Sequence, residues 1–465
     1  MLLRQRITTW LPEILLVLLA LFFAFRELST FPAVWADDGL FMIVAKSVSM
    51  GQGYALPVLG KIWPFPYILS IGPPLILPAA LSLKIFGFSV EAARFPMALY
   101  LLGTCALLYI FTQRSAGRTA ARWALLLLIT LSAFVNTGKP VMGEIPGFFF
   151  LLLGLLVLHR NKIEMKHAIL AGFCFGLAIL AKLTYGIVLP VLLLPWAIAL
   201  LRRDWATVRW LTVTGLLAFA MYLPWRFLEM SSATGLGGEF RFLIGEGADE
   251  GDVLFLTRIF RGELVFLRPP FVLYGLLLVL GSTGLWKLRT KLPKHLVIIL
   301  FSLITLFTLF FVGSFGWYRH LLPAHMLLLP FVFVGATAFL GKKIAAAVLL
   351  GIALLQGLWQ LDHRGSSGSM EAIATAQYVE EHYRGKDLLV RAQEVYVRLS
   401  PDPHWLFYTG KKISLRIPKE FTTLTAEQQC MPVLMKLSSE EIMQNKDTAE
   451  QAGGRYYILP PAEDC

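Results

Sequence analysis

The sequence is poor in charged residues, and this scarcity decides the class of protein. Only 15% of the 465 residues are Asp, Glu, Lys or Arg, whereas 57% are hydrophobic. A soluble globular protein could not cover its surface with so few charges. No glycine-rich phosphate-binding loop is visible, so nothing in the sequence predicts a nucleotide-binding enzyme. We therefore expect a membrane protein that crosses the bilayer several times.

Long apolar runs are what the sequence has in abundance. Eleven of them approach the length of one bilayer crossing: 10–28, 93–113, 119–135, 145–159, 166–182, 184–201, 206–226, 269–287, 294–313, 319–339 and 343–361. A crossing takes about 20 apolar residues. A further apolar stretch, 73–88, opens with two prolines and carries Lys84, so it could be a short span or lie at the membrane surface.

The basic residues decide between these alternatives, because cytoplasmic loops carry an excess of Lys and Arg. If 73–88 does not span, seventeen basic residues share one side of the membrane: Arg4, Arg6, Arg114, Arg118, Arg122, Arg160, Lys162, Lys166, Arg202, Arg203, Arg209, Lys287, Arg289, Lys291, Lys294, Lys342 and Lys343. If it spans, every later basic loop moves outside. We therefore predict a cytoplasmic N-terminus and an external C-terminal tail. These loops explain much of the net charge of +12, so nucleic-acid binding is not implied.

The composition changes after residue 361, where HRGSSGS reads as a linker. In the polar tail, 371–383 and 438–444 read as helices, and 387–392, 413–417, 432–437 and 456–460 read as short strands. We expect a transmembrane domain at 1–361 and a small external α/β domain at 362–465. Cys430 and Cys465 share this tail and could form a disulfide in an oxidising compartment.

Five ionisable residues are predicted to share one level at the external face. Asp37 and Asp38 follow the first span, and Glu144 and Arg319 each begin a span. Lys182 lies 16 residues beyond Lys166. That is roughly 24 Å at the helix rise of about 1.5 Å per residue, close to the thickness of the hydrocarbon core.

Each of these residues also has a structural interpretation. Asp38 could cap a helix, Glu144 could favour a helix N-terminus, Lys182 could snorkel, and Arg319 could anchor its span at the interface. Three carboxylates and two cations at one depth favour a functional site. A divalent cation such as Mg²⁺ would take carboxylate and phosphate oxygens, whereas Lys and Arg would complement phosphate charge.

The order of several motifs resembles the GT-C integral-membrane glycosyltransferases. The family 39-like branch, with the protein O-mannosyltransferases and the bacterial aminoarabinose transferase of lipid A, is the most similar. The motifs are the acidic pair in the first external loop, a PPL segment ending in FG, EAARFP, GLAILAKLTYG, YLPW and YRHLLPAHM. The resemblance covers nearly all of residues 1–361.

The resemblance implies the GT-C fold, with about eleven transmembrane helices and juxtamembrane helices in the first external loop. It also implies a glycosyltransferase in a bacterial inner membrane, with its active site on the periplasmic side. Such an enzyme moves a sugar from a polyprenyl-phosphate donor to a lipid, glycan or protein acceptor, and it needs no nucleotide cofactor.

By position, Asp37 matches the family's external-loop Asp and Asp38 matches the acidic residue after it, so the resemblance implies that both are catalytic, with Asp37 as the general base. Lys182 and Arg319 match residues that hold the lipid phosphate. Glu144, with Asp38, would hold a divalent cation, Mg²⁺ or Mn²⁺. The alternative is a polytopic transporter or flippase for lipid or polysaccharide, which would place ionisable residues near mid-span.

Overall fold

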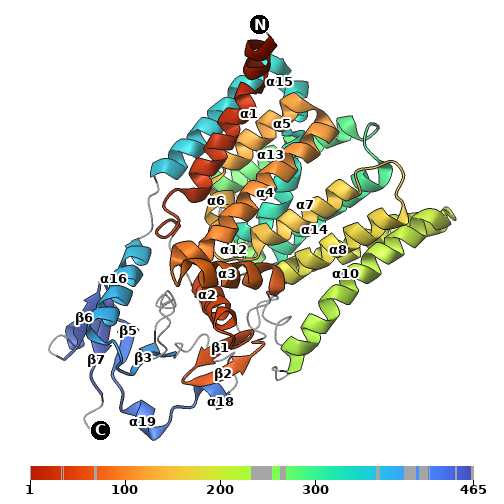
Figure 1. Ribbon diagram of the computed structural model, residues 1–465. Coiled ribbons are helices and arrows are strands. Elements are labelled where there is room, and N and C mark those ends of the chain that lie inside the picture. Colours follow the sequence, from red (N-terminus) through yellow and green to blue (C-terminus); the bar gives the residue numbers. More distant parts are fainter. Residues whose placement is uncertain are drawn as a thin grey trace.

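The computed structural model describes residues 2–32, 34, 36–66, 71–231, 254–261, 269–362, 367–391, 405–407, 417, 419–445 and 448–461. Long helices form a bundle, and a small sheet domain lies near one end of it (Figure 1). The bundle contains α1 (Leu2–Phe25), α4 (Val90–Ala116), α5 (Arg118–Thr130), α6 (Ser132–Gly138), α7 (Glu144–Val157), α8 (Met165–Ala181), the 3-10 helix η2 (Leu183–Ile187), α9 (Val188–Leu201), α10 (Trp205–Ser231), α12 (Phe255–Phe260), α13 (Pro269–Leu288), α14 (Lys294–Gly313) and α15 (Tyr318–Asp362).

The bundle confirms the predicted class of helical, polytopic membrane protein. Within the described residues, six helices are long and apolar enough to cross a membrane, or seven if the bent pair α5 and α6 is one span. Each of the eleven predicted stretches coincides with helix. Two of them, 319–339 and 343–361, fall within α15, which breaks at Gly341, where φ is +73°. The stretch 119–135 is divided between α5 and α6, which meet at 62°.

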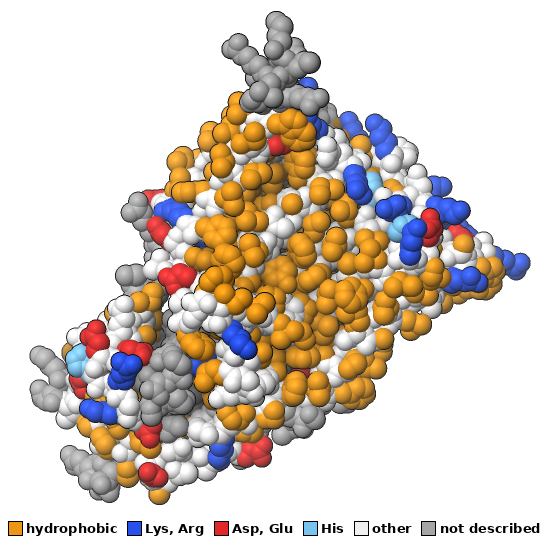
Figure 2. Space-filling view, viewed as in Figure 1, with side chains coloured by type: hydrophobic (Ala, Val, Ile, Leu, Met, Phe, Trp, Pro, Cys, Tyr) orange, Lys and Arg blue, Asp and Glu red, His pale blue; other side chains and the backbone are white. Residues whose placement is uncertain are grey.

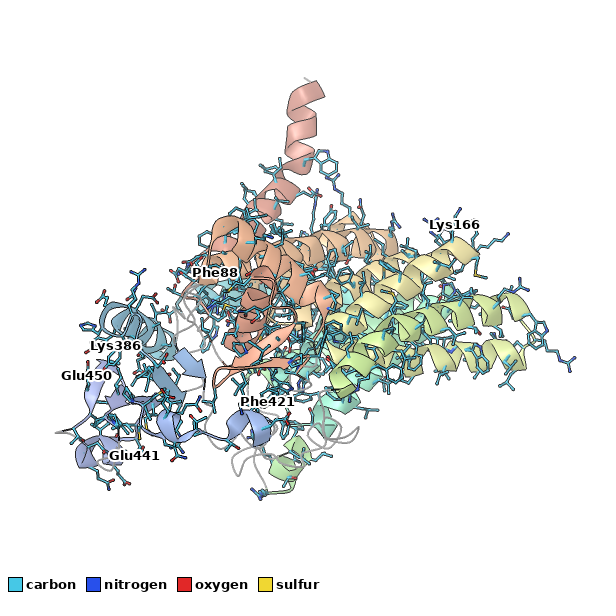
Figure 3. The ribbon with its side chains drawn as sticks, turned by 60° about the horizontal axis from the view of Figure 1, so that its bottom comes forward. Phe88, Lys166, Lys386, Phe421, Glu441 and Glu450 are labelled. Atoms are coloured by element: carbon cyan, nitrogen blue, oxygen red, sulfur yellow. The ribbon has the colours of Figure 1, made fainter. Side chains whose placement is uncertain are left out.

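The surface follows the same division between apolar and basic sequence. A broad band of hydrophobic side chains covers the bundle, and Lys and Arg gather along the edge farthest from the sheet domain (Figure 2). Lys166, the second residue of α8, lies at that far end in Figure 3, whereas Phe421 lies in the C-terminal part of the chain, away from that end. This gathering of cations at one end agrees with the loop charges from which the topology was predicted.

The segment between α1 and α4 forms two short helices and a hairpin that fold over one end of the bundle: α2 (Ala36–Ser49), β1 (Ala55–Val58), β2 (Lys61–Pro64) and α3 (Pro73–Phe86). The hairpin turns at Leu59 and Gly60, which both have positive φ, of 49° and 76°. Two residues with positive φ are typical of a tight type I′ turn.

α3 is the stretch that was predicted not to span. Two prolines occupy its first positions, and Gly87, at φ 89°, ends it after 14 residues. Leu75 and Ile76 are fully buried, whereas Leu81 and Ile85 are 59% and 63% exposed. One face therefore packs on the protein, and the other presents apolar side chains outward, as expected of a helix lying in the interface.

Close packing of glycines fixes α15 against α13. A Cβ atom on Gly335 would lie 1.8 Å from the Leu280 carbonyl oxygen, and one on Gly284 would lie 2.0 Å from the Phe331 oxygen. Small residues let helix backbones approach closely in a membrane, where packing replaces the hydrophobic effect as the driving force. This contact matters for function because α15 carries Arg319 in its first turn.

Gly335→Val is expected to destabilise the protein by about 1 to 3 kcal/mol or more, because the new side chain meets backbone that cannot rotate away. Gly351→Val is the matched control, since Gly351 lies on the same helix with nothing within 4 Å of an added Cβ. Thermal unfolding of both variants in detergent measures the difference. Equal melting temperatures would contradict this account of the α13–α15 contact.

The C-terminal part forms the small α/β domain predicted from the tail. Its sheet has the strand order β4 (Trp405–Phe407), β3 (Leu388–Arg391), β5 (Val433–Lys436), β7 (Tyr456–Leu459) and β6 (Glu450–Gly453), with β4, β3 and β5 parallel and the others antiparallel. The helices are α16 (Ser367–His382), α18 (Lys419–Thr422), α19 (Ala426–Gln429) and α20 (Ser439–Gln444). The predicted strand at 413–417 falls almost wholly outside the described residues. Cys430 is disulfide-bonded, and Cys465 is not among the described residues.

The two faces of the sheet pack against different parts of the protein. Leu388 and Val390 belong to the domain's own core, whereas Leu389, between them, belongs to the apolar cluster of the segment between α1 and α4. This alternation follows from the two-residue period of a strand. The Phe421 ring also stacks on Trp63 of the hairpin at 5.7 Å. The sheet domain therefore docks on the loop that carries Asp37.

Candidate active site

Three helices begin and one ends at the same level of the bundle, close to the segment between α1 and α4. Asp37, Glu144 and Arg319 lie in the first turns of α2, α7 and α15, and Lys182 immediately follows α8. Four distant chain segments thus bring two carboxylates and two cations together.

Ion pairs link these four side chains in the order Asp37, Arg319, Glu144 and Lys182. Arg319 Nη1 donates to Asp37 Oδ2 at 2.8 Å, and Arg319 Nε lies 3.9 Å from Glu144 Oε1. Lys182 Nζ lies 3.6 Å from the same Glu144 oxygen. The Asp37 side chain is 38% exposed, and those of Lys182 and Arg319 are each 12% exposed. Asp37 is therefore the member of the group most open to an incoming molecule.

Glu144 is buried, and both its carboxylate oxygens could still accept hydrogen bonds. Its side chain is 5% exposed, and neither carboxylate oxygen accepts a hydrogen bond from the described residues. Its two ion-pair distances, 3.6 and 3.9 Å, exceed hydrogen-bond length. A buried carboxylate without hydrogen bonds is costly, so this arrangement favours a polar ligand that completes the site.

Local packing explains why Glu144 and Lys182 lie side by side. A Cβ atom on Gly143 would lie 2.0 Å from the Ala181 carbonyl oxygen and 3.0 Å from Lys182 Cβ, so only glycine permits this approach. The Tyr185 hydroxyl donates to the Glu144 carbonyl oxygen at 2.5 Å. Aromatic rings flank the two cations, with Phe41 5.7 Å from Lys182 Nζ and Trp317 4.5 Å from the Arg319 guanidinium.

Asp38 points away from this group into a separate buried ion pair. Arg94 Nη2 donates to Asp38 Oδ2 at 2.5 Å, and the Val141 backbone N–H donates to Asp38 Oδ1 at 2.6 Å. Both side chains are fully buried. Arg94 Nη1 also donates to the carbonyl oxygens of Leu28 and Pro32, at 3.0 and 2.9 Å. Asp38 thus ties the start of α2 to α4 and to the segment before α7.

The donor set does not fit the predicted divalent cation between Asp38 and Glu144. Both Asp38 oxygens are engaged by protein donors, and Glu144 faces two cations. Among the described residues, no group of three or more His, Cys, Asp or Glu side chains could hold a metal ion. The geometry therefore brings Glu144 together with Lys182 and Arg319, and separates it from Asp38.

Sequence reasoning missed Arg94 and Tyr185 as supporting residues. Arg94 lies in EAARFP, which stood out only as a motif, and its pairing with Asp38 depends on how α2 and α4 meet. A signal was nevertheless present, because Arg94 lies within the predicted span 93–113, where a charged residue requires a partner. Tyr185 offered no such signal, since a tyrosine near a membrane surface is ordinary.

Comparisons with known proteins bear on the family and the fold. Residues 72–227 match the family described as dolichyl-phosphate-mannose-protein mannosyltransferase. ArnT from Cupriavidus metallidurans, solved bound to undecaprenyl phosphate, has a TM-score of 0.65 and 14% sequence identity, over 97% of this chain and 98% of that chain. No curated protein sequence matches this chain.

Two structures of an archaeal enzyme share the fold over a smaller part of their own length. The Archaeoglobus fulgidus oligosaccharyltransferase AglB, in complex with an inhibitory peptide and a dolichol-phosphate, has a TM-score of 0.53 and 15% identity, over 86% of this chain and 61% of that chain. The oligosaccharyltransferase of the same organism in complex with Zn and sulfate has a TM-score of 0.54 and 17% identity, over 84% and 57%. The partial family match and the shared fold together confirm the resemblance to the GT-C glycosyltransferases, in the branch of the protein mannosyltransferases and ArnT.

Proposed function

We propose that this protein transfers a sugar from a polyprenyl-phosphate donor to a hydroxyl group of a lipid, glycan or protein acceptor, at the external face of a bacterial inner membrane. The observation that carries the proposal is the charged group of Asp37, Arg319, Glu144 and Lys182, drawn from four chain segments to one end of the bundle. ArnT and AglB were solved with polyprenyl phosphates, which supports the same class of donor here.

In this proposal the acceptor hydroxyl attacks the anomeric carbon of the donor sugar. Asp37, the most exposed carboxylate of the group, takes the hydroxyl proton. The bond between the anomeric carbon and the phosphate oxygen breaks, and the polyprenyl phosphate leaves with the bonding electrons. Lys182 and Arg319 stabilise the developing charge on that phosphate.

Glu144 and Asp38 take supporting roles. The carboxylate oxygens of Glu144, which accept no hydrogen bond from the described residues, are suited to accept hydrogen bonds from sugar hydroxyls. The negative charge of Glu144 holds Lys182 and Arg319 in place. Asp38, bonded to Arg94, fixes the first turn of α2 and with it the neighbouring Asp37. No step requires a metal ion.

The transporter alternative receives less support. A transporter places its ionisable residues near the middle of its spans, at the point where access alternates. Here the four linked charges lie at helix ends, on one level. Mass spectrometry of envelope glycolipids and glycoproteins, comparing a deletion strain with its parent, tests transfer and identifies the acceptor.

Lys182→Met should weaken donor binding by about 10-fold to 100-fold, because charge-assisted hydrogen bonds contribute about 1.5 to 3 kcal/mol. The measurement is titration of the protein in nanodiscs with undecaprenyl phosphate, which presents the lipid phosphate of the donor without its sugar. Lys84→Met is the matched control, since Lys84 is an exposed residue of α3 at the same end of the bundle. Wild-type affinity in Lys182→Met would remove this residue from the phosphate site.

A further inference from the structure

One histidine beside the charged group has no place in the proposed reaction. His320 follows Arg319 in the first turn of α15, and its side chain is partly buried. The charges of Arg319, Lys182 and Asp37 act on its imidazole ring. The ring therefore lies near the groups assigned to the donor phosphate and to the general base, where a polar side chain can meet a substrate.

Only one of the two ring nitrogens of His320 has a hydrogen-bond partner among the described residues. Nδ1 lies 3.1 Å from Ser314 Oγ, at the end of α14. Ser314 Oγ in turn donates to the Phe311 carbonyl oxygen at 3.3 Å. A serine hydroxyl has a single proton, so the Nδ1–H of His320 donates to Ser314. In the neutral imidazole the other nitrogen, Nε2, then carries a lone pair and accepts hydrogen bonds.

Aromatic rings hold the imidazole in this orientation. The centroid of the Phe310 ring lies 5.1 Å from that of His320, and the centroid of the Trp317 ring lies 5.5 Å from it. The Trp317 ring also lies 4.5 Å from the Arg319 guanidinium. The two nitrogens lie on different edges of an imidazole, so the bond from Nδ1 to Ser314 leaves Nε2 on another edge. A fixed acceptor thus lies beside the cation assigned to the phosphate.

A hydroxyl group is the chemical partner that suits this acceptor. A nitrogen without a proton cannot donate to a phosphate oxygen, so the lipid phosphate does not satisfy Nε2. In the proposed donor, the sugar is joined to that phosphate through a single oxygen. A hydroxyl of the sugar therefore lies within a short distance of any phosphate that Arg319 holds, and His320 is the next residue of the chain.

We propose that His320 Nε2 accepts a hydrogen bond from a hydroxyl group of the donor sugar, so that His320 helps to select the sugar. Ser314 fixes the tautomer and the orientation of the ring, and Asp37 remains the base. This role rests on the proposed function, because it requires a donor in which a sugar is attached to the polyprenyl phosphate.

Two substitutions separate the two ring nitrogens. The amide nitrogen of His320→Asn can replace Nδ1 and keep the bond to Ser314, whereas the amide oxygen of His320→Gln reaches the place of Nε2. His320→Asn should lower the affinity for the sugar-bearing donor by about 2-fold to 10-fold, the usual contribution of one neutral hydrogen bond, and His320→Gln should keep most of it. Both variants should bind undecaprenyl phosphate, which has no sugar, as tightly as the wild type.

The sugar-bearing probe is the polyprenyl-phosphate sugar that accumulates in a deletion strain, extracted from its membranes and titrated into the protein in nanodiscs. His382→Asn, the same change at an exposed histidine of α16, is the matched control. Wild-type affinity for this probe in His320→Asn would overturn the proposal. An equal loss for undecaprenyl phosphate would also overturn it, because the ring would then only support Arg319. A wild-type protein that does not bind the probe at all would contradict the proposed function itself, and this role with it.

Discussion

Asp37→Asn is expected to lower the rate of sugar transfer by about 100-fold to 10,000-fold, the usual contribution of a general base. The amide keeps the size of the carboxylate and can still accept the hydrogen bond that Arg319 Nη1 makes at 2.8 Å. Arg319 should therefore stay in place, and donor binding should change little. The expected loss appears in kcat, with the donor Kd nearly constant.

Single-turnover transfer and donor titration in nanodiscs separate the two effects. Asp204→Asn is the control, because Asp204 lies at the opposite end of the bundle, where its side chain accepts from the Thr207 N–H at 3.1 Å. The same change of Asp to Asn there should leave transfer unaffected. A transfer rate near that of the wild type in Asp37→Asn would show that Asp37 serves only to stabilise the start of α2. The assignment of Asp37 as general base would then be wrong.

Arg94→Leu is expected to reduce the free energy of unfolding by about 3 to 5 kcal/mol, because it leaves the Asp38 carboxylate buried without its partner. The variant also removes the two hydrogen bonds to Leu28 and Pro32, at 3.0 and 2.9 Å. The segment before α2 should loosen, so transfer should fall even at temperatures where the variant remains folded.

Unfolding in detergent measures this effect against Arg114→Leu, which removes an exposed arginine near the other end of α4. The double variant Asp38→Leu with Arg94→Leu should be more stable than Arg94→Leu alone, since it buries no unpaired charge. If Arg94→Leu has the same free energy of unfolding as the wild-type protein, the buried pair of Asp38 and Arg94 does not hold the loop that carries Asp37 in place.

The depth of the site residues could be predicted from the sequence, because a helix of known rise crosses a bilayer of known thickness. That argument placed Lys182, Glu144 and Arg319 together, and the structure joins them through ion pairs. Depth says nothing about rotation around a helix axis. For that reason the sequence could not distinguish Asp37, which faces Arg319, from Asp38, which faces Arg94.

Parts of the fold without strong periodicity were also beyond sequence analysis. The hairpin at 55–64 contains two prolines and only four residues per strand, so it gave no strand signal. The break of α15 at Gly341, by contrast, falls between the predicted spans 319–339 and 343–361, where Lys342 and Lys343 interrupt the apolar pattern. A hydropathy pattern thus locates an interruption by charge but does not record a short hairpin.

The docking of the sheet domain on the hairpin joins parts of the chain that are made far apart in time. Gln428 Nε2 donates to the Leu59 carbonyl oxygen at 3.2 Å, across 369 positions of sequence. At a synthesis rate of about 5 to 20 residues per second, the Trp63 indole precedes the Phe421 ring that stacks on it by roughly 20 to 70 s. The loop that carries Asp37 and Asp38 is thus among the first parts of the chain to be translated and among the last to acquire all its contacts.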